Sequence, residues 1–236
     1  MTIDQYNSSL AQKEFELHGE RWLQERFSGK FNTIFDVGCN IGEWTTMTRK
    51  YQPQADIHMF EVMPDTYRSM LSNVQLDKTM YPNSFGLSDY NGTLEMKYVP
   101  NYSAMSTSVM DLRLDGSVTR HGLVIKGDDY VKSRNIESID YLKIDTEGAE
   151  DKVFKGFENT LKEGKIKVIQ FEYGFVCVLT KWLLIDSYNY LTPLGYTLGR
   201  LKNGSIVFKD YALTDEDFNG PDFIAVHASV KHEFGL

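Results

Sequence analysis

The chain has 236 residues, 42% of them hydrophobic and 25% charged, a composition that allows a substantial globular core. Its 33 acidic residues outnumber 25 basic ones, and the net charge of −8 argues against a surface that follows the phosphates of DNA or RNA. Two cysteines make no disulfide framework, and no run approaches the roughly 18 apolar residues of a membrane-spanning helix. Residues 1–10 also lack the pattern of a secretory signal. We therefore expect a cytoplasmic protein with no membrane span and no nucleic-acid partner.

Apolar periodicity and the positions of Gly and Pro predict helices and strands that alternate along the chain. The first half contains, in order, a helix over 8–27, a strand over 33–37, a helix over 43–51, a strand over 56–61, a helix from residue 64 and a strand over 85–87. The second half contains a hairpin turn at Asn91-Gly92, a strand over 94–98, a polar irregular segment over 100–121, a strand over 123–125, a helix over 128–135, a strand over 139–145, a helix ending at Gly164, a strand over 166–172, a helix over 176–191, a hairpin around Asn203-Gly204 and a strand over 222–228. This order predicts one α/β domain over residues 1–236, with residues 1–30 as a helical extension. Its sheet is expected to be mostly parallel, covered by helices on both faces, with an antiparallel edge.

The turn after the first strand, DVGCNIG over residues 36–42, has the character of a nucleoside-binding loop. Gly38 permits a sharp turn and a close approach of bare backbone to a ligand, and Gly42 precedes a helix whose N-terminus offers free N–H groups. A dinucleotide site would read G-x-G-x-x-G, but Asn40 stands at the second glycine position. Asp36 would repel a phosphate and suits a ligand with an amine and a sulfonium. We interpret the loop as a site for S-adenosylmethionine (SAM).

Glu61, at the end of the second strand, supports this interpretation. A carboxylate in that place can accept hydrogen bonds from both ribose hydroxyls. Residues 86–89 follow the next strand, where this architecture often touches the adenine ring. The expected SAM contacts are therefore Asp36, Gly38, Asn40, Gly42, Glu61, Val62, Ser88 and Asp89.

Acidic residues gather at the ends of two later strands. Asp145 ends the strand over 139–145, and Lys143 lies on the same face and can pair with it. Glu147, Glu150 and Glu172 can converge on the same mouth of the sheet. We take Asp145, Lys143, Glu147 and Glu172 as catalytic candidates, with Asp145 first as general base. Asp145 and Glu172 are also candidate ligands for Mg²⁺, although such carboxylates can equally bind substrate hydroxyls or cap the following helix, and Glu150 fits a helix surface as well.

Other residue types add little to the site. His121, in the polar segment, is the one histidine with a plausible catalytic place, whereas His58 fits a core position. No His/Cys spacing predicts zinc. The chain lacks the Asn/Asp-Pro-Pro-Tyr run typical of base methyltransferases that act on amines, which argues against a nucleobase amine as acceptor.

Three stretches together resemble the FkbM-type SAM-dependent methyltransferases: the 36–42 loop, Phe60-Glu61, and KIDTEGAE over residues 143–150. The resemblance covers roughly residues 33–173, and Val62 stands where the family usually has proline. It implies a doubly wound class I methyltransferase fold of seven strands, the last antiparallel. It also implies O-methylation, often of sugar or natural-product hydroxyls.

The leading hypothesis is thus a SAM-dependent O-methyltransferase acting on a hydroxyl of a small molecule or sugar. A nucleotide-dependent oxidoreductase with a degenerate loop is the second hypothesis, and the spacing of Gly38 and Gly42 disfavours it. A non-catalytic SAM-binding module is the third, and the acids around Asp145 argue against it. The sequence leaves the acceptor, the metal dependence and a possible homo-oligomer open.

Overall fold

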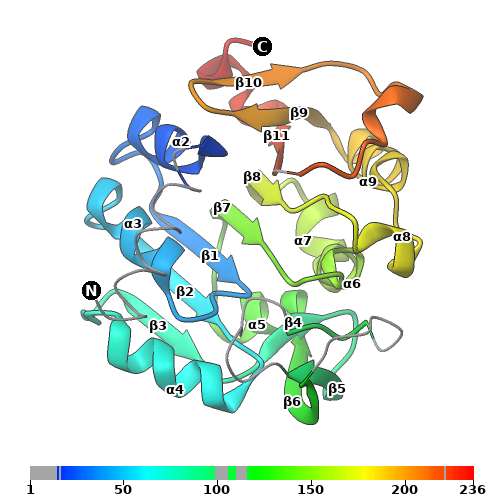
Figure 1. Ribbon diagram of the computed structural model, residues 1–236. Coiled ribbons are helices and arrows are strands. Elements are labelled where there is room, and N and C mark those ends of the chain that lie inside the picture. The colour runs from blue at the N-terminus through cyan, green and yellow to red at the C-terminus, as the bar shows by residue number, and fades with distance from the viewer. Residues whose placement is uncertain (1–14, 16, 99–105, 110–115, 221) are drawn as a thin grey trace.

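The computed structural model describes residues 15, 17–98, 106–109, 116–220 and 222–236 (Figure 1). An eight-stranded sheet with the order β10-β9-β11-β8-β7-β1-β2-β3 forms its centre. Its strands are β1 (Thr33–Val37), β2 (Asp56–Phe60), β3 (Met80–Asn83), β7 (Ile139–Ile144), β8 (Ile166–Phe171), β9 (Tyr196–Lys202), β10 (Ser205–Phe208) and β11 (Phe223–His227). Strands β1, β2, β3, β7 and β8 pair in parallel, and β11 runs antiparallel to both β8 and β9.

The predicted α/β sheet with an antiparallel last strand is therefore confirmed, with one change in the strand count. The sheet has eight strands instead of seven, because β10 pairs with β9 through the Asn203-Gly204 turn and forms an additional edge. Gly204 suits this turn, since a tight hairpin favours a residue with positive φ and Gly204 has φ 81°.

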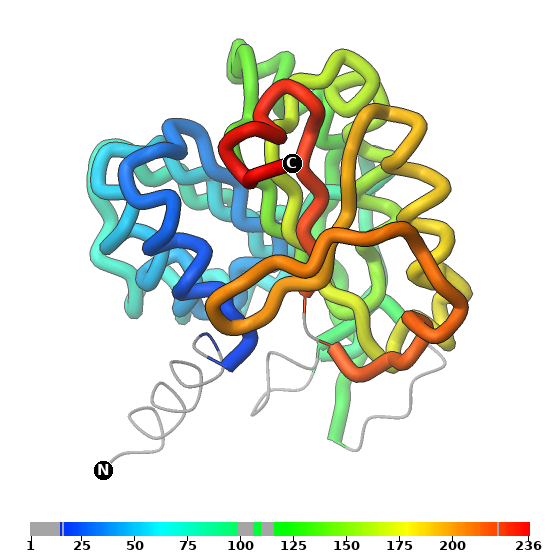
Figure 2. Tube along the Cα trace, turned by 90° about the horizontal axis from the view of Figure 1, so that it is seen from above, coloured from blue at the N-terminus to red at the C-terminus, as the bar shows by residue number. Residues whose placement is uncertain are grey.

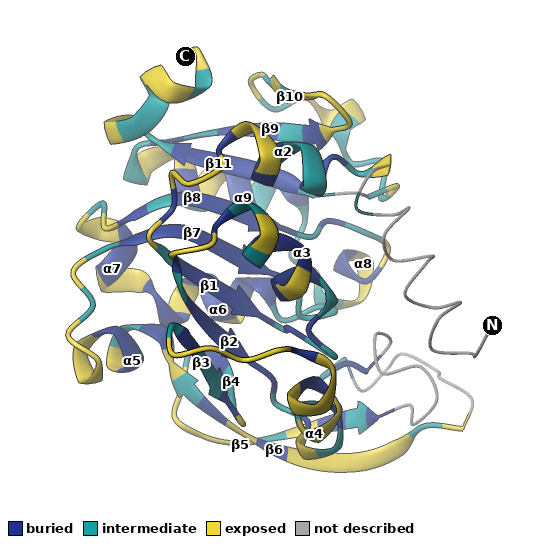
Figure 3. Ribbon diagram, turned by 90° about the vertical axis from the view of Figure 1, so that its left-hand side faces the viewer, coloured by how far each residue is buried: buried dark blue, intermediate teal, exposed yellow. Residues whose placement is uncertain are grey.

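Helices cover both faces of the sheet, as predicted (Figures 1 and 3). One face carries α2 (Glu20–Arg26), α3 (Glu43–Tyr51) and α4 (Pro64–Asn73), and the other carries α5 (Gly127–Ser133), α6 (Glu150–Gly156), α7 (Glu158–Lys162) and α9 (Leu184–Leu191). Short helical turns complete the chain: α8 (Cys177–Thr180), η2 (Thr192–Leu194), η3 (Leu213–Asp215) and η4 (Ala228–Phe234). Neighbouring strand residues such as Ile34 and Phe35 are both fully buried, because they point to opposite covered faces. Among the described helices, none has the length and apolarity needed to cross a bilayer.

A second, three-stranded sheet departs from the prediction. It consists of β4 (Gly86–Ser88), β5 (Gly92–Tyr98) and β6 (Val118–Lys126) in the order β4-β6-β5. The strand predicted over 85–87 as the next strand of the main sheet is thus misplaced, since β3 takes that position. The predicted Asn91-Gly92 hairpin is also wrong, because β6 lies between the two strands that this turn connects.

The polar segment predicted over 100–121 is partly strand. Residues 118–121 belong to β6, whose polar side chains there are exposed, while 99–105 and 110–115 lie outside the described residues. The helix predicted over 176–191 is broken into α8 and α9 at Lys181, which has φ 59°.

The N-terminal helix predicted over 8–27 falls partly on residues 1–14 and 16, which lie outside the described residues. Within this range, α2 begins after Gly19 and packs beside the β9–β10 turn (Figure 2). A Cβ on Gly19 would lie 2.3 Å from the backbone oxygen of Lys202, so the two segments are in close contact. Residue Glu20 of α2 is buried under this contact.

Candidate active site

The glycine loop after β1 is fixed by the ends of two neighbouring strands. The backbone N–H groups of Gly38 and Cys39 both donate to the Phe60 carbonyl at the end of β2, at 3.0 Å each. Gly38 has φ 83°, and a Cβ there would lie 1.8 Å from the Asp145 backbone oxygen. Only glycine allows this approach, which brings the ends of β1 and β7 together.

A cavity opens at the carboxyl ends of β1, β2 and β7, where open α/β sheets bind ligands. Its wall combines these strand ends with the second sheet and with residues 106 and 108. The lining residues are Val37, Gly38, Asn40, Phe60, Glu61, Val62, Met63, Gly86, Leu87, Leu94, Met96, Ser106, Ser108, Val124, Asp145, Thr146, Glu147 and Ala149. The charged residues in this described lining are Glu61, Asp145 and Glu147, so the cavity has an acidic character.

Glu61 is held on both carboxylate oxygens by backbone amides. Its Oε2 accepts from Asn40 N at 3.0 Å, and its Oε1 accepts from Met63 N at 2.8 Å. Burial raises the pKa of Glu61 to about 7, and these amide hydrogen bonds oppose the rise because they favour the charged form. The carboxylate is thereby fixed in orientation at the cavity wall.

The eight residues expected to contact SAM divide into two groups. Gly38, Asn40, Glu61 and Val62 line the cavity. The other four, Asp36, Gly42, Ser88 and Asp89, are absent from this described lining.

Asp36 and Gly42 have clear structural surroundings instead. Asp36 is fully buried beneath the loop, where its Oδ2 accepts from Thr45 Oγ1 at 2.5 Å, and burial raises its pKa. Gly42 precedes α3, and a Cβ there would lie 2.2 Å from the Val74 side chain at the end of α4. Gly42 therefore lets two helices pack closely, whereas Ser88 is buried beneath Gly156 of α6.

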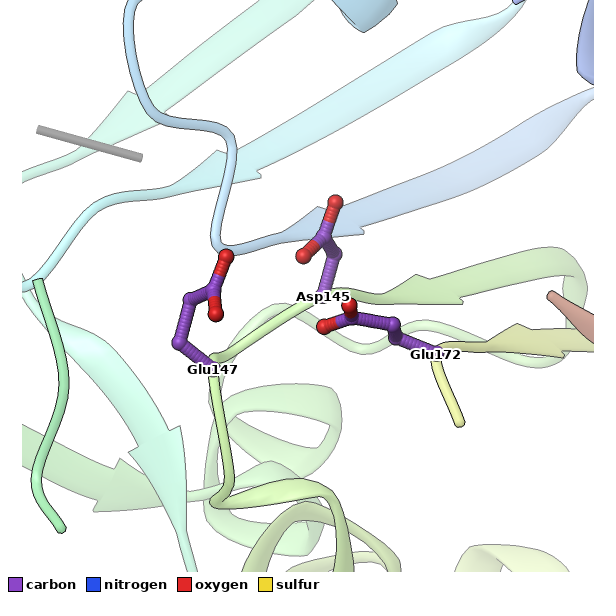
Figure 4. Close-up of side chains that lie close together, drawn as sticks. All are labelled: Asp145, Glu147 and Glu172. Atoms are coloured by element: carbon purple, nitrogen blue, oxygen red, sulfur yellow. The ribbon is translucent and has the colours of Figure 1, made fainter. Parts of the chain in front are cut away.

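Three carboxylates meet at the ends of β7 and β8 (Figure 4). One oxygen from each of Asp145, Glu147 and Glu172 lies within 4.8 Å of the others, and we call these residues the carboxylate cluster. Burial and the neighbouring Asp145 charge raise the pKa of Glu147 to about 8, and the same two causes raise that of Glu172. The cluster thus brings together three of the four catalytic candidates and both candidate metal ligands.

Lys143, the fourth catalytic candidate, lies buried directly under this cluster. Its Nζ is 2.7 Å from Asp145 Oδ2 and 5.6 Å from the centre of the Trp44 ring. Burial alone would lower the pKa of Lys143, but the carboxylates around it, Asp145 foremost, raise it above its ordinary value. Lys143 is therefore a cation that holds Asp145 in place.

The turn that carries Glu147 is clamped by buried groups. Glu147 has φ 52°, a strained value for a residue other than glycine. The Glu150 carboxylate accepts from Thr146 N at 2.9 Å, from Thr146 Oγ1 at 2.8 Å and from Gly148 N at 3.3 Å. Thr107 Oγ1 donates to the Glu147 carbonyl. Glu150 thus supports the turn from a buried position rather than lying on a helix surface.

Residues 106–109, the described part of the middle of the polar segment, reach over the carboxyl ends of the strands. Ser106 and Ser108 line the cavity, and Thr107 pairs with Lys97 through two backbone hydrogen bonds of 2.8 and 3.0 Å. His121 is exposed on β6, where its Nε2 lies 3.3 Å from Glu95, and it is not part of the described lining.

Sequence reasoning missed three polar residues that gather around Gln170, the register neighbour of Lys143. Two of them, Glu20 of α2 and Gln170 of β8, are fully enclosed, and the third, Asp222, which precedes β11, is half-buried. Their convergence depends on strand register, and no local motif marks them.

The strand order, with β11 antiparallel between β8 and β9, and the cavity at the carboxyl ends of the strands define a Rossmann-like class I methyltransferase fold. The family model described as the methyltransferase FkbM domain matches residues 36–196. The chain therefore belongs to the FkbM methyltransferase family, which confirms the resemblance seen in the sequence.

Curated relatives match parts of the chain. A hexuronic acid methyltransferase, AglP, of Haloferax volcanii is 27% identical over 144 residues, which are 61% of this chain and 57% of that protein. The methyltransferase sdnD of Sordaria araneosa is 32% identical over 155 residues, 53% of this chain and 60% of that protein. The 31-O-demethyl-FK506 methyltransferase FkbM of Streptomyces tacrolimicus is 25% identical over 156 residues, 54% of this chain and 60% of that protein. The matches thus span somewhat over half the length of these relatives.

Solved structures show a more distant likeness. The precorrin-6y C5,15-methyltransferase of Geobacter metallireducens is 10% identical with a TM-score of 0.45 and coverage of 87% of both chains. The plantazolicin methyltransferase BpumL, solved with SAH, is 11% identical with a TM-score of 0.45, covering 95% of this chain and 91% of that one.

Proposed function

We propose that this chain is a SAM-dependent O-methyltransferase that acts on a hydroxyl of a small molecule or sugar. The observation that carries the proposal is one cavity with acids contributed by two parts of the sheet edge. Glu61 comes from the end of β2, and Asp145 and Glu147 come from the end of β7. The first suits the donor's ribose, and the others suit activation of an acceptor hydroxyl.

The residues on the donor side fit SAM better than a dinucleotide. Gly38 leaves the backbone bare, and Glu61 presents a carboxylate in a fixed orientation for two ribose hydroxyls. The described lining contains acids and neither Lys nor Arg. An acidic wall favours a sulfonium and an amine, and it disfavours a pyrophosphate. Asp36 adds to this character from beneath the loop.

The acceptor side can align a hydroxyl and remove its proton. When bound, SAM supplies an electrophilic methyl group, which an acceptor oxygen displaces in line with sulfur. Asp145 is our first candidate for the general base, because its contact with Lys143 at 2.7 Å fixes the carboxylate at the cavity wall. Glu147 is the second candidate, because its pKa of about 8 lies near neutral pH, where proton transfer in both directions is easy.

Magnesium is another means by which the carboxylate cluster would activate a hydroxyl. The oxygens of Asp145, Glu147 and Glu172 lie within 4.8 Å of one another, and carboxylate oxygens are ligands that Mg²⁺ prefers. Turnover measured after dialysis against EDTA, with and without added Mg²⁺, separates the two mechanisms. Full turnover in EDTA assigns the cluster to proton transfer alone, whereas loss that Mg²⁺ restores assigns it to metal binding.

The acceptor class follows from the polar wall and from what the relatives are named for. Ser106 and Ser108 add hydroxyls beside the cluster, so this wall can both donate to and accept from a hydroxyl-rich molecule. One relative is named for hexuronic acid and another for an oxygen of FK506. We infer that the acceptor is a sugar or a natural product with free hydroxyls.

Two measurements test the proposed function against its alternatives. Calorimetry with SAM, S-adenosylhomocysteine (SAH) and NADH should show binding of the first two and not of the third. Binding of NADH alone would favour a nucleotide-dependent oxidoreductase. Incubation with methyl-labelled SAM and a panel of monosaccharides, uronic acids and macrolides should then place label in an ether. Donor binding with no transfer to any member would favour a non-catalytic SAM-binding module.

A further inference from the structure

A short extended segment, residues 106–109, lies between β5 and the turn that follows β7. On one side it pairs with β5, because the N–H and the carbonyl of Thr107 both bond to Lys97 in an antiparallel bridge. On the other side it reaches the turn, since a Cβ on Gly148 would lie 2.7 Å from Val109 Cγ2. The segment therefore connects the second sheet to the turn that carries one acid of the carboxylate cluster.

Side chains alternate along this segment as they do along a strand. Ser106 and Ser108 line the cavity, whereas Thr107 between them is 1% exposed and lies outside the described lining. Its buried hydroxyl donates to the Glu147 carbonyl and accepts from Val109 N at 3.0 Å. One side chain thus satisfies a carbonyl of the turn and an N–H of its own segment.

The backbone of Glu147 needs such a restraint. Its φ of 52° lies in the left-handed region, which disfavours a residue with a side chain, and here it places the carboxylate beside Asp145 and Glu172 (Figure 4). Glu150 holds the N–H groups of the residues before and after Glu147, and Thr107 holds the Glu147 carbonyl. Without the Thr107 bond, the peptide that follows Glu147 can rotate toward the more favourable right-handed region, which would take the carboxylate out of the cluster.

We propose that Thr107 is a positioning residue whose hydroxyl holds Glu147 in the carboxylate cluster. Thr107 lies outside the described cavity lining, so it acts through Glu147 and not by contact with a ligand. Its neighbours Ser106 and Ser108 face the cavity, so the segment that would contact an acceptor also fixes one of the acids that act on it. The inference rests on the proposed methyl transfer, because that proposal gives the cluster its role toward the acceptor.

Two substitutions of Thr107 separate its hydroxyl from its shape. Thr107→Val keeps the branched side chain and removes the hydroxyl, whereas Thr107→Ser keeps the hydroxyl. Loss of one hydrogen bond that opposes backbone strain should lower kcat/KM for the best acceptor of the panel, whether monosaccharide, uronic acid or macrolide, by roughly three- to tenfold. The Kd of SAH should stay at the wild-type value, because the donor side is untouched. Thr107→Ser should remain within about twofold of wild type in kcat/KM.

A double-mutant cycle tests whether Thr107 acts through Glu147. In a Glu147→Ala background there is no carboxylate to hold, so adding Thr107→Val should change kcat/KM by less than about twofold. Thr119→Val is the matched control, because Thr119 of β6 also pairs with Lys97 and its side chain is exposed. This control should leave kcat/KM at the wild-type value.

The outcomes separate the inference from the proposed function. Wild-type kcat/KM in Thr107→Val, an equal loss in Thr107→Ser, or a loss that persists in full without the Glu147 carboxylate would overturn the inference. An equal loss of SAH affinity would also overturn it and leave Thr107 a general structural role. If Thr107→Val does not fold, Thr107→Ala decides by the same criteria, since its smaller side chain cannot crowd the turn. Wild-type protein that binds SAH but methylates no member of the panel would refute the proposed function, and the inference with it.

Discussion

Two sets of acids stand at the same edge of the sheet and differ in what surrounds them. Glu61 is buried, and each of its oxygens accepts a backbone N–H. The carboxylate cluster at the ends of β7 and β8 is half-buried, and its carboxyl groups face one another (Figure 4). Backbone donors fix a carboxylate for binding, whereas mutually close carboxylates acquire raised pKa values and can exchange protons. From this difference we propose that Glu61 binds the donor and that the cluster acts on the acceptor.

The largest expected effect comes from the cluster. Asp145→Asn keeps the shape of the side chain and removes its charge and basicity. Turnover should fall by about 10²- to 10⁴-fold, the usual contribution of a general base, while the variant still binds SAH. Steady-state kinetics and calorimetry on the same preparation measure both. Asp140→Asn, the same change at the other end of β7, should leave turnover near wild type. Full turnover in Asp145→Asn would remove its catalytic role.

Gly38, which brings the ends of β1 and β7 together, should be the position where a small substitution lowers the free energy of unfolding most. Gly38→Ala would place a Cβ 1.8 Å from the Asp145 oxygen, so the ends of β1 and β7 must separate. Gly29→Ala is the matched control, because Gly29 also has a left-handed φ of 70° and a Cβ there meets nothing within 4 Å. Backbone strain should lower the free energy of unfolding of the control by about 1 kcal/mol, and Gly38→Ala should lower it by at least about 3 kcal/mol. Equal urea midpoints for the two variants would show that the contact does not matter.

Glu61→Gln tests whether the Glu61 carboxylate binds the methyl donor. The new amide can accept from one backbone N–H but opposes the other, so the held orientation is lost. Removing hydrogen bonds to a charged group costs about 1.5–3 kcal/mol, which predicts a loss of roughly ten- to hundredfold in affinity. SAM and SAH should lose affinity equally, because the ribose is common to both. Asp36→Asn should weaken binding less, since Asp36 lies beneath the loop. A Glu61→Gln variant that binds SAM and SAH with wild-type affinity would contradict the proposed role of Glu61 in donor binding.

The smallest expected effect is a change in pH dependence from Glu147→Gln. Glu147 accepts a proton only in its ionised form, which becomes populated as the pH rises through its pKa of about 8. If Glu147 shares in proton removal, wild-type kcat should gain a rising limb near that pH, and the variant should lose it. At pH 7 the effect should stay below about tenfold, because only about a tenth of the group is then ionised. Superimposable profiles would leave Asp145 as the sole base.

Local signals predicted those parts of the fold that local chemistry determines. Asn203-Gly204 forms the predicted hairpin, because the two strands that it connects, β9 and β10, pair directly with each other at the edge of the main sheet. The same dipeptide at Asn91-Gly92 joins two strands that both pair with β6, a strand some 30 residues further along the chain. A turn motif specifies a change of direction, but the pairing partner depends on long-range contacts.

In the candidate site, too, the residues marked by local sequence could be predicted, and those brought together by long-range contacts could not. Glu61 and the 143–150 motif could be predicted because each lies at a strand end marked by its own neighbours. The sequence predicts Asp36 as a ligand contact, and in the structure this residue lies buried beneath the loop, where Thr45 Oγ1 donates to it. Glu20 and Asp222 could not be found, because their meeting at Gln170 depends on the register of β7 and β8 and on the docking of α2.

Titration calorimetry of the wild-type chain with SAM tests the central claim most directly. One saturable site, with SAH competing for it and NADH failing to compete, is the result that an acidic, glycine-lined cavity predicts. A flat titration from correctly folded protein, with no change in melting temperature on adding SAM or SAH, would contradict the account.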